Sequence, residues 1–270
     1  MTLSDFTKVP VCWFQLSILA LVFLPNLILA QQEQDAVQRA NRLVSVSDGW
    51  AKGKPSTPGS SVEVREVSRR FEQGILIVQY HVFVKGVPKD QTYTSVNWPI
   101  NAAGPSDTMY GLTISDDGLV ICAGREPDQC SSPKGKDDPV EFTFLPGRAE
   151  IYRQALVSAD LGTKVYFAVV PDPILEKNKG CSLEAVRLTP KFETVMIRGK
   201  GYKPNEDLQF LSNSYNEAQN MKVKANADGE FVASLLPFVK DKATGKTNVE
   251  LRGANCAPKV TFEWGKLHPN

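Results

Sequence analysis

The chain has 270 residues, a formal net charge of +1, 42% hydrophobic residues and 23% charged residues. This apolar content excludes a disordered chain, and the near-zero charge gives no basic excess for binding the phosphates of a nucleic acid. The sequence contains two histidines, which leaves little for histidine-based metal or acid–base chemistry.

The first 30 residues have the features of a secretory signal peptide. Lys8 supplies a short positive region, and residues 11–30 form an apolar run ending at Ala30, the predicted last residue before cleavage. The mature chain would begin at the polar Gln31. An uncleaved membrane anchor is the alternative, because a spanning helix needs about 20 apolar residues. We expect no membrane span after signal cleavage, because no later segment is long and apolar enough.

Residues 31–60 are polar and end in a stretch rich in Gly, Pro, Ser and Lys. This composition is typical of an N-terminal segment or linker. Within it, residues 35–43 are predicted to form one short helix.

Residues 61–173 consist of short extended segments separated by turns rich in Gly, Pro and Asp. This spacing predicts an all-β sandwich rather than alternating helices and strands. Residues 75–84 form a nearly continuous apolar run, which suits a central strand. The predicted strands cover residues 62–67, 75–84, 92–98, 109–114, 119–122, 140–145, 150–157 and 164–170.

A domain boundary is predicted near residue 173, because Pro171 and Pro173 cannot continue a paired strand. Residues 181–266 would then form a second β-sandwich domain, with a hairpin turn between Asn226 and Gly229. Its predicted strands cover residues 182–189, 192–199, 206–214, 219–227, 230–238, 245–253 and 258–264.

Four cysteines remain after signal cleavage, and an even number in an exported chain indicates two disulfides. Three pairings are possible. We favour Cys122–Cys130, which closes a short turn-rich loop, together with Cys181–Cys256, which joins the two ends of the second domain. The paired spacings that are typical of zinc sites do not occur.

Two segments of the second domain carry a family resemblance. Residues 199–208, GKGYKPNEDL, resemble the G-x-G-F-x-P-x-E segment near the start of bacterial immunoglobulin-like domains of the IPT/TIG kind. Residues 225–231, ANADGEF, are similar to an Asp-Gly-x-Phe hairpin of such domains. The resemblance implies an immunoglobulin-like β-sandwich that acts as a spacer or binding module, and it supplies no catalytic residues. The whole layout resembles exported bacterial proteins with two β-sandwich domains.

Aromatic side chains are the candidates for a ligand-stacking surface, and Trp98, Tyr110 and Trp50 are the residues we favour. Trp98 ends a strand before a proline, which makes it the best placed for exposure. Aromatics in small sandwiches lie more often in the core. Trp264 alternates with apolar neighbours and is predicted to point inward.

No catalytic residue is predicted. His81 lies in mid-strand and His268 lies near the end of the chain, so neither suits a Ser-His-Asp triad. The loop acids fall short of a calcium-binding pattern, and no spacing singles out a carboxylate pair for glycoside hydrolysis. The acids considered are Asp107, Asp116, Asp117, Asp137, Asp138, Glu141 and Glu150. We therefore expect no metal and no cofactor.

These observations favour a non-catalytic binding or scaffolding protein, secreted, periplasmic or on the cell surface, with a carbohydrate or a protein as its ligand. One alternative is a carboxylate-dependent polysaccharide hydrolase, which would need two carboxyl groups ~5 to 10 Å apart in a cleft. The other is a structural spacer of a cell-surface assembly. The sequence predicts no oligomeric state.

Overall fold

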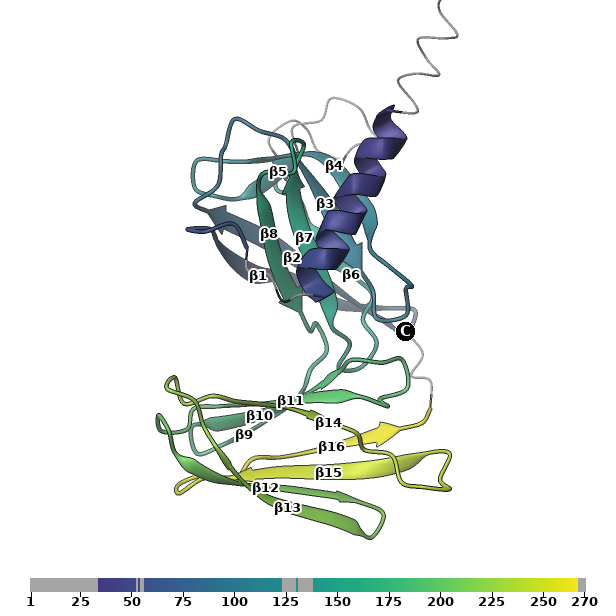
Figure 1. The fold of residues 1–270 in the computed structure, drawn as a ribbon, viewed down its shortest axis with the longest axis vertical. Helices are drawn as coiled ribbons and strands as arrows, with labels where there is room; N and C mark the ends of the chain where they lie inside the picture. Colours follow the sequence, from purple (N-terminus) through teal and green to yellow (C-terminus); the bar gives the residue numbers. More distant parts are fainter. Residues whose placement is uncertain (1–33, 52, 54–55, 123–129, 131–137, 267–270) are drawn as a thin grey trace, which may run out of the picture. The chain divides into compact units, whose positions relative to one another are not determined.

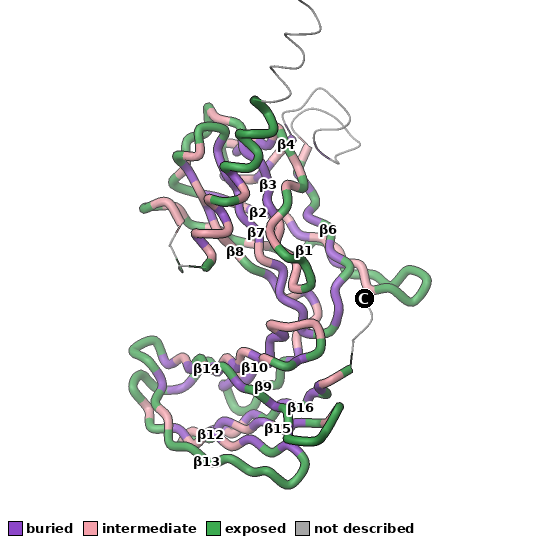
Figure 2. The backbone as a smooth tube through the Cα atoms, turned by 45° about the vertical axis from the view of Figure 1, so that its right-hand side comes forward, coloured by how far each residue is buried: buried purple, intermediate pink, exposed green. Residues whose placement is uncertain are grey.

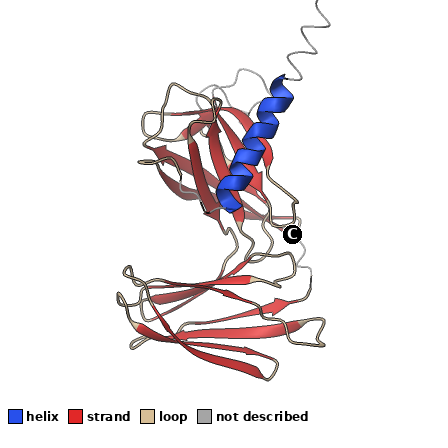
Figure 3. Cartoon of the chain, viewed as in Figure 1, coloured by secondary structure: helices blue, strands red, loops and turns tan. Residues whose placement is uncertain are grey.

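The computed structural model describes residues 34–51, 53, 56–122, 130 and 138–266, and the regular structure in these ranges is almost all β-strand (Figures 1 and 3). This confirms the predicted all-β class. The predicted signal peptide (residues 1–30), His268 and Asp137 lie outside the described residues. By its contacts the chain divides into two units, Met1–Ser45 and Val46–Asn270.

A helix runs over residues 34–51, which is longer than the predicted 35–43. Within the second unit, its last turns place Val46 in a fully buried position. Gly53 follows the helix with a φ of 59°, and its N–H donates to the carbonyl oxygen of Trp50 at 3.2 Å. A glycine in this left-handed conformation is a common end for a helix.

The first two sheets are formed by the strands β1 to β8. One sheet has three strands in the order β1-β2-β6, and the other has five in the order β5-β4-β3-β7-β8. All pairs are antiparallel. The strands are β1 (Ser61–Glu72), β2 (Ile75–Lys85), β3 (Tyr93–Trp98), β4 (Ser106–Ile114), β5 (Val120–Cys122), β6 (Phe142–Phe144), β7 (Tyr152–Ser158) and β8 (Lys164–Val169).

The first hydrophobic cluster lies between these two sheets. Its strand residues come from β2 to β8. In β2, every second residue from Val78 to Val84 is buried, while the residues between them are partly exposed. This alternation is the period-two pattern of a strand with one face in the core. Figure 2 shows the buried positions following the strands.

The edge strand β1 carries three Arg–Glu ion pairs along its own length. Their N···O distances are 2.5 to 2.7 Å, and all six side chains are substantially exposed. The pairs are Glu63–Arg65, Glu66–Arg69 and Arg70–Glu72. Charged side chains on an edge strand oppose pairing with further strands.

The other two sheets have four strands each, in the orders β14-β11-β10-β9 and β13-β12-β15-β16. Their core contains Trp264, which is 2% exposed, as predicted. The first strand of this group was not predicted from the sequence. The strands are β9 (Ile174–Asn178), β10 (Cys181–Arg187), β11 (Val195–Lys200), β12 (Asp207–Ser214), β13 (Glu217–Lys224), β14 (Phe231–Leu235), β15 (Gly245–Arg252) and β16 (Lys259–Trp264).

Both favoured disulfides are present, which confirms the predicted pairing. Cys122 is bonded to Cys130, and Cys181 is bonded to Cys256. The second bond links the first residue of β10 to the loop just before β16.

The second hydrophobic cluster includes one residue from the earlier part of the chain, Ala149. Its N–H donates to the backbone carbonyl oxygen of Asp172 at 2.7 Å, and its carbonyl oxygen accepts from the N–H of Arg187 at 2.8 Å. Next to it, Glu150 and Arg187 form an ion pair at 3.1 Å in which both side chains are 3% exposed. The predicted domain limits of 61–173 and 181–266 stay a prediction.

The motif that carries the family resemblance, residues 199–208, forms the turn that follows β11. The hydroxyl of Tyr202 donates to the carbonyl oxygen of Leu251 at 3.0 Å, which ties this turn to β15. The Glu206 carboxylate accepts from the backbone N–H groups of Ala254 at 2.6 Å and Lys203 at 2.8 Å. These two bonds hold the pKa of Glu206 below its usual value.

We expect Gly201→Ala to lower the free energy of unfolding by about 1–3 kcal/mol. Gly201 has a φ of 85°, and an added Cβ would lie 2.3 Å from the carbonyl oxygen of Gly180. Urea unfolding of the variant measures the loss. The control is Gly180→Ala, where φ is 91° but the added Cβ meets nothing within 4 Å. Equal losses in the two variants would show that the close contact costs nothing.

Candidate functional site

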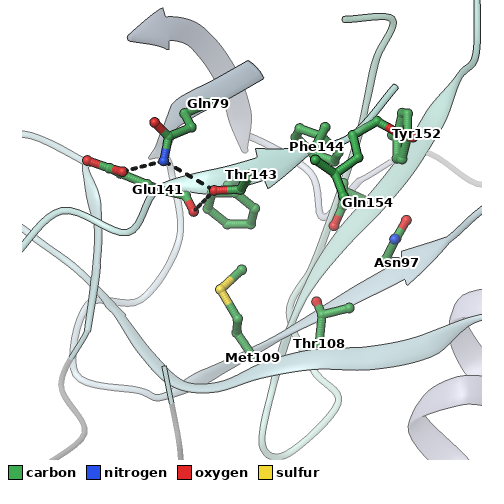
Figure 4. A pocket seen from close by; sticks show the side chains of 11 residues that line it. Gln79, Asn97, Thr108, Met109, Glu141, Thr143, Phe144, Tyr152 and Gln154 are labelled. Carbon is green, nitrogen blue, oxygen red and sulfur yellow. Dashed lines mark hydrogen bonds between the residues drawn. The ribbon is translucent and has the colours of Figure 1, made fainter. Parts of the chain in front are cut away.

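A cleft of about 620 Å³ runs along β6, the edge strand of the three-stranded sheet. We call it the β6 cleft. One wall is formed by β6 and its neighbour β2, and the other by β3, β4 and β7 of the five-stranded sheet (Figure 4). Its lining residues are Gln79, Asn97, Thr108, Met109, Glu141, Phe142, Thr143, Phe144, Leu145, Tyr152 and Gln154.

A hydrogen-bonded polar group borders one end of the cleft. The Gln79 amide donates to the Glu141 carboxylate at 2.6 Å and to the Thr143 hydroxyl at 3.3 Å. The carbonyl oxygen of the same amide accepts from Arg70 at 2.6 Å. Figure 4 shows the three cleft side chains gathered together. The amide is therefore held in one orientation, with both of its polar atoms engaged.

The opposite wall adds a second polar group. The Thr108 hydroxyl donates to the Ser95 hydroxyl at 3.1 Å, and Ser95 in turn lies 3.4 Å from the Gln154 side-chain oxygen. The Asn97 side-chain oxygen is buried without a hydrogen-bond partner among the described residues. Because an unsatisfied buried acceptor costs free energy, Asn97 is a position where a ligand's donor could bind.

Aromatic rings form part of the apolar lining, together with Met109 and Leu145. The rings of Phe144 and Tyr152 lie edge to face with centroids 4.7 Å apart, and Tyr80 packs on Phe144 at 5.8 Å. The Tyr152 hydroxyl donates to the carbonyl oxygen of Leu145 at 2.9 Å. Burial raises the pKa of Tyr80 to about 12 and also raises that of Tyr152, so both phenols are neutral at physiological pH.

The residues predicted to bind a ligand do not line the β6 cleft, but two of them, Trp50 and Trp98, are in contact. The Trp50 ring lies 5.7 Å from Trp98 and 5.6 Å from Tyr166, and Arg153 stacks over Trp98 at 5.2 Å. Trp98 is partly buried, and its indole N–H donates to the carbonyl oxygen of Ala102 at 3.2 Å. Tyr110 is 37% exposed, and its hydroxyl donates to Asp107. A ligand role for Trp50, Trp98 and Tyr110 stays a prediction.

The acids weighed in the sequence are spread over several places. Glu141 lines the cleft, and Glu150 is buried in its ion pair with Arg187. Asp116 and Asp117 lie in an exposed turn, where the Ser115 hydroxyl lowers the pKa of Asp117. Among the described residues, no group of three or more His, Cys, Asp or Glu side chains is placed to hold a metal ion.

Sequence reasoning missed the amides that line the cleft. A usable signal was present on β7, where Gln154 stands between Tyr152 and Leu156 on the face that points to the core. A buried amide in an apolar row needs a hydrogen-bond partner, so it marks either a structural bond or a binding position.

Comparisons with known proteins show no family for this chain. No family model matches it, and no curated protein matches it. A solved structure titled "Biofilm associated protein - BSP domain" aligns with 9% identity and a TM-score of 0.21, over 87% of this chain and 55% of that chain. The chain thus spans about half the length of that structure, and a likeness this weak carries no argument. In the part of the chain described here, no helix has the length and apolar character to cross a bilayer.

Proposed function

We propose that the chain is an exported, non-catalytic protein that binds a carbohydrate in the β6 cleft. The observation that carries this proposal is the lining of the cleft, where neutral amides and hydroxyls stand beside aromatic rings. An amide offers a donor and an acceptor side by side, which matches the neighbouring hydroxyls of a sugar. Phe144 and Tyr152 are themselves buried, and the exposed Leu145 side chain beside them offers an apolar surface to the C–H face of the sugar. The volume of about 620 Å³ is that of a small-molecule site.

The carboxylates support binding without hydrolysis. Among the described residues that line the cleft, Glu141 supplies the one carboxyl group, and the Gln79 amide donates to it. A carboxylate-dependent glycosidase needs a pair. Glu150, two residues before β7, is engaged with Arg187 instead. A polysaccharide hydrolase is therefore the less supported alternative.

Export is supported by the two disulfides, because such bonds persist in oxidising compartments outside the cytosol. The apolar run of residues 11–30 supplies the signal in this proposal, with cleavage after Ala30. The mature protein would be secreted, periplasmic or on the cell surface.

The second group of sheets supports an immunoglobulin-like domain of the IPT/TIG kind. In immunoglobulin domains, strands A, B and E share one sheet and strands C, F and G the other. If β10 is strand A, the sheet β14-β11-β10 has the order E-B-A, and β12-β15-β16 has the order C-F-G. The motif residues Gly201, Tyr202 and Glu206 have structural roles here, which fits a fold signature rather than an active site.

We expect Asn97→Leu to weaken carbohydrate binding about 10-fold, because the Asn97 side-chain oxygen has no partner among the described residues and can accept from a sugar hydroxyl. A glycan array probed with residues 31–270 would identify the sugar, and calorimetry would give the two affinities. The control is Asn220→Leu, which removes an exposed amide that accepts from Gln209 and does not line the cleft.

The two measurements separate the alternatives. Failure of every glycan to bind, or equal loss in the Asn97→Leu and Asn220→Leu variants, would contradict a carbohydrate site in the β6 cleft. Release of reducing sugar from a bound polysaccharide would show a hydrolase instead. Capture of a peptide that competes for the cleft would reassign the ligand to a protein.

A further inference from the structure

The strand β14 forms a free sheet edge with exposed apolar side chains. It is the terminal strand in the order β14-β11-β10-β9 and pairs with β11 on one side. Val232, Leu236 and Phe238 are 59%, 57% and 55% exposed. From residue 231 to residue 239, past the end of β14, inward and outward positions continue to alternate, and a turn follows at Lys240. An edge of this kind is a template for another strand.

The β14 edge differs from the edge strands β1 and β13 in that it lacks charged residues. Residues 231–239 contain no charged residue, whereas β1 carries its Arg–Glu pairs and β13 carries Lys222 and Lys224. Lysine on an edge strand is a common protection against pairing, and β14 lacks it. The uncharged run is bounded by a negative residue, Glu230, and a positive one, Lys240.

These two charges make the segment complementary to itself. In an antiparallel pair of identical strands centred on Leu235, Glu230 of each copy lies opposite Lys240 of the other. The same register places Val232 opposite Phe238, so exposed apolar side chains meet on one face of the sheet. A shift by one residue would put inward positions opposite outward ones, which a half-buried sheet does not tolerate.

We propose that β14 is a dimerisation edge, where it pairs antiparallel with β14 of a second copy of this chain in the register centred on Leu235. The two four-stranded sheets would then join into one sheet across the pair of copies. Pro237 has no N–H to donate, which limits the ladder on either side of the centre. Glu230 already pairs with Lys200 at 2.8 Å, but both side chains are well exposed, so that bond is easily exchanged. The proposal is independent of any ligand in the β6 cleft.

The test uses charge exchange in the mature chain, measured by sedimentation equilibrium. We expect the wild-type protein to dimerise between about 1 and about 500 μM, because a contact of one strand lies at the weak end of interface sizes. Glu230→Lys alone places two positive charges opposite each other at both ends of the pair. Lys240→Glu alone places two negative charges there. Each single variant is expected to raise the dimer dissociation constant about 10-fold.

An equimolar mixture of the two single variants is the decisive measurement. In the mixed dimer, the substituted position 230 of one variant faces the substituted position 240 of the other, and the two carry opposite charges. The other end of the pair keeps its native Glu230 opposite its native Lys240. Dimerisation is therefore expected to return to the wild-type level in the mixture and in the doubly substituted chain. Circular dichroism of each variant checks that the fold is unchanged.

Three results would overturn the proposal. One is a wild-type chain that stays monomeric at the highest concentration. Another is dimerisation that the single substitutions leave unchanged. The third is a mixture that remains as weak as its two components, which would place the contact at another surface.

Discussion

Replacing Cys181 and Cys256 by serine is expected to lower the free energy of unfolding by about 4.5 kcal/mol in the chain-entropy model. The bond closes a loop with a sequence separation of 75, so its loss releases much conformational freedom in the unfolded chain. Both cysteines are buried, at 4% and 7% exposure, and they hold the start of β10 beside the loop before β16. Urea unfolding, followed by hydrogen exchange of β10 to β16, measures the loss.

The other disulfide is the matched control. Cys122 and Cys130 are separated by 8 residues, and the same model gives about 2.5 kcal/mol for a loop of that length. The double serine variant at these two positions is expected to affect β5 and its neighbours more than the second group of sheets. A larger loss from the short loop than from the long one would contradict the entropic explanation.

Arg187→Met is expected to lower the free energy of unfolding by about 3–5 kcal/mol, the usual cost of leaving one member of a buried ion pair alone. Glu150 would remain buried with its carboxylate accepting from the Gly147 N–H at 3.0 Å, while the Tyr152 hydroxyl, 3.3 Å away, donates to Leu145. Arg187 also donates to the carbonyl oxygen of Pro190, so the variant frees that oxygen as well. Thermal and urea unfolding give the size of the loss.

Two further variants show whether the buried charge is the cause. Replacing both partners by apolar residues, Glu150→Leu with Arg187→Met, is expected to recover much of the stability, because no charge is then buried. Arg65→Met, which breaks the exposed pair with Glu63, is expected to cost far less stability than Arg187→Met, because the charges of the exposed pair are solvated and screened. If the double variant were no more stable than Arg187→Met, the loss would come from packing instead.

The sequence predicted most strands because their signals are local. Alternation of apolar residues and turns rich in Gly, Pro and Asp are visible without any partner strand. The strand β9 was missed for the opposite reason. It follows directly after two prolines, and only Ile174 of its five residues is buried. Its backbone bonds to β10 define it, and these do not show in an apolar pattern.

The full length of the helix and the position of the cleft were not predicted, because both depend on contacts between residues far apart in the sequence. The helix extends to residue 51 because Val46 and Trp50 gain partners far along the chain, as the contact of Trp50 with Tyr166 shows. The cleft brings together Gln79, Thr108 and Gln154 from three strands distant in sequence. The spacing of these residues along the chain does not predict that they line one cleft. The pairing of the cysteines, in contrast, followed from their positions relative to the predicted strands.

The three ion pairs on β1 have a consequence for the protein when it is stressed. A further strand added to this edge would have to accommodate six charged side chains, which disfavours its pairing. Growth of stacked β-fibrils needs edges that accept strand after strand without such a penalty. A heated or crowded population of this protein therefore has a built-in barrier to amyloid growth along its longest exposed strand.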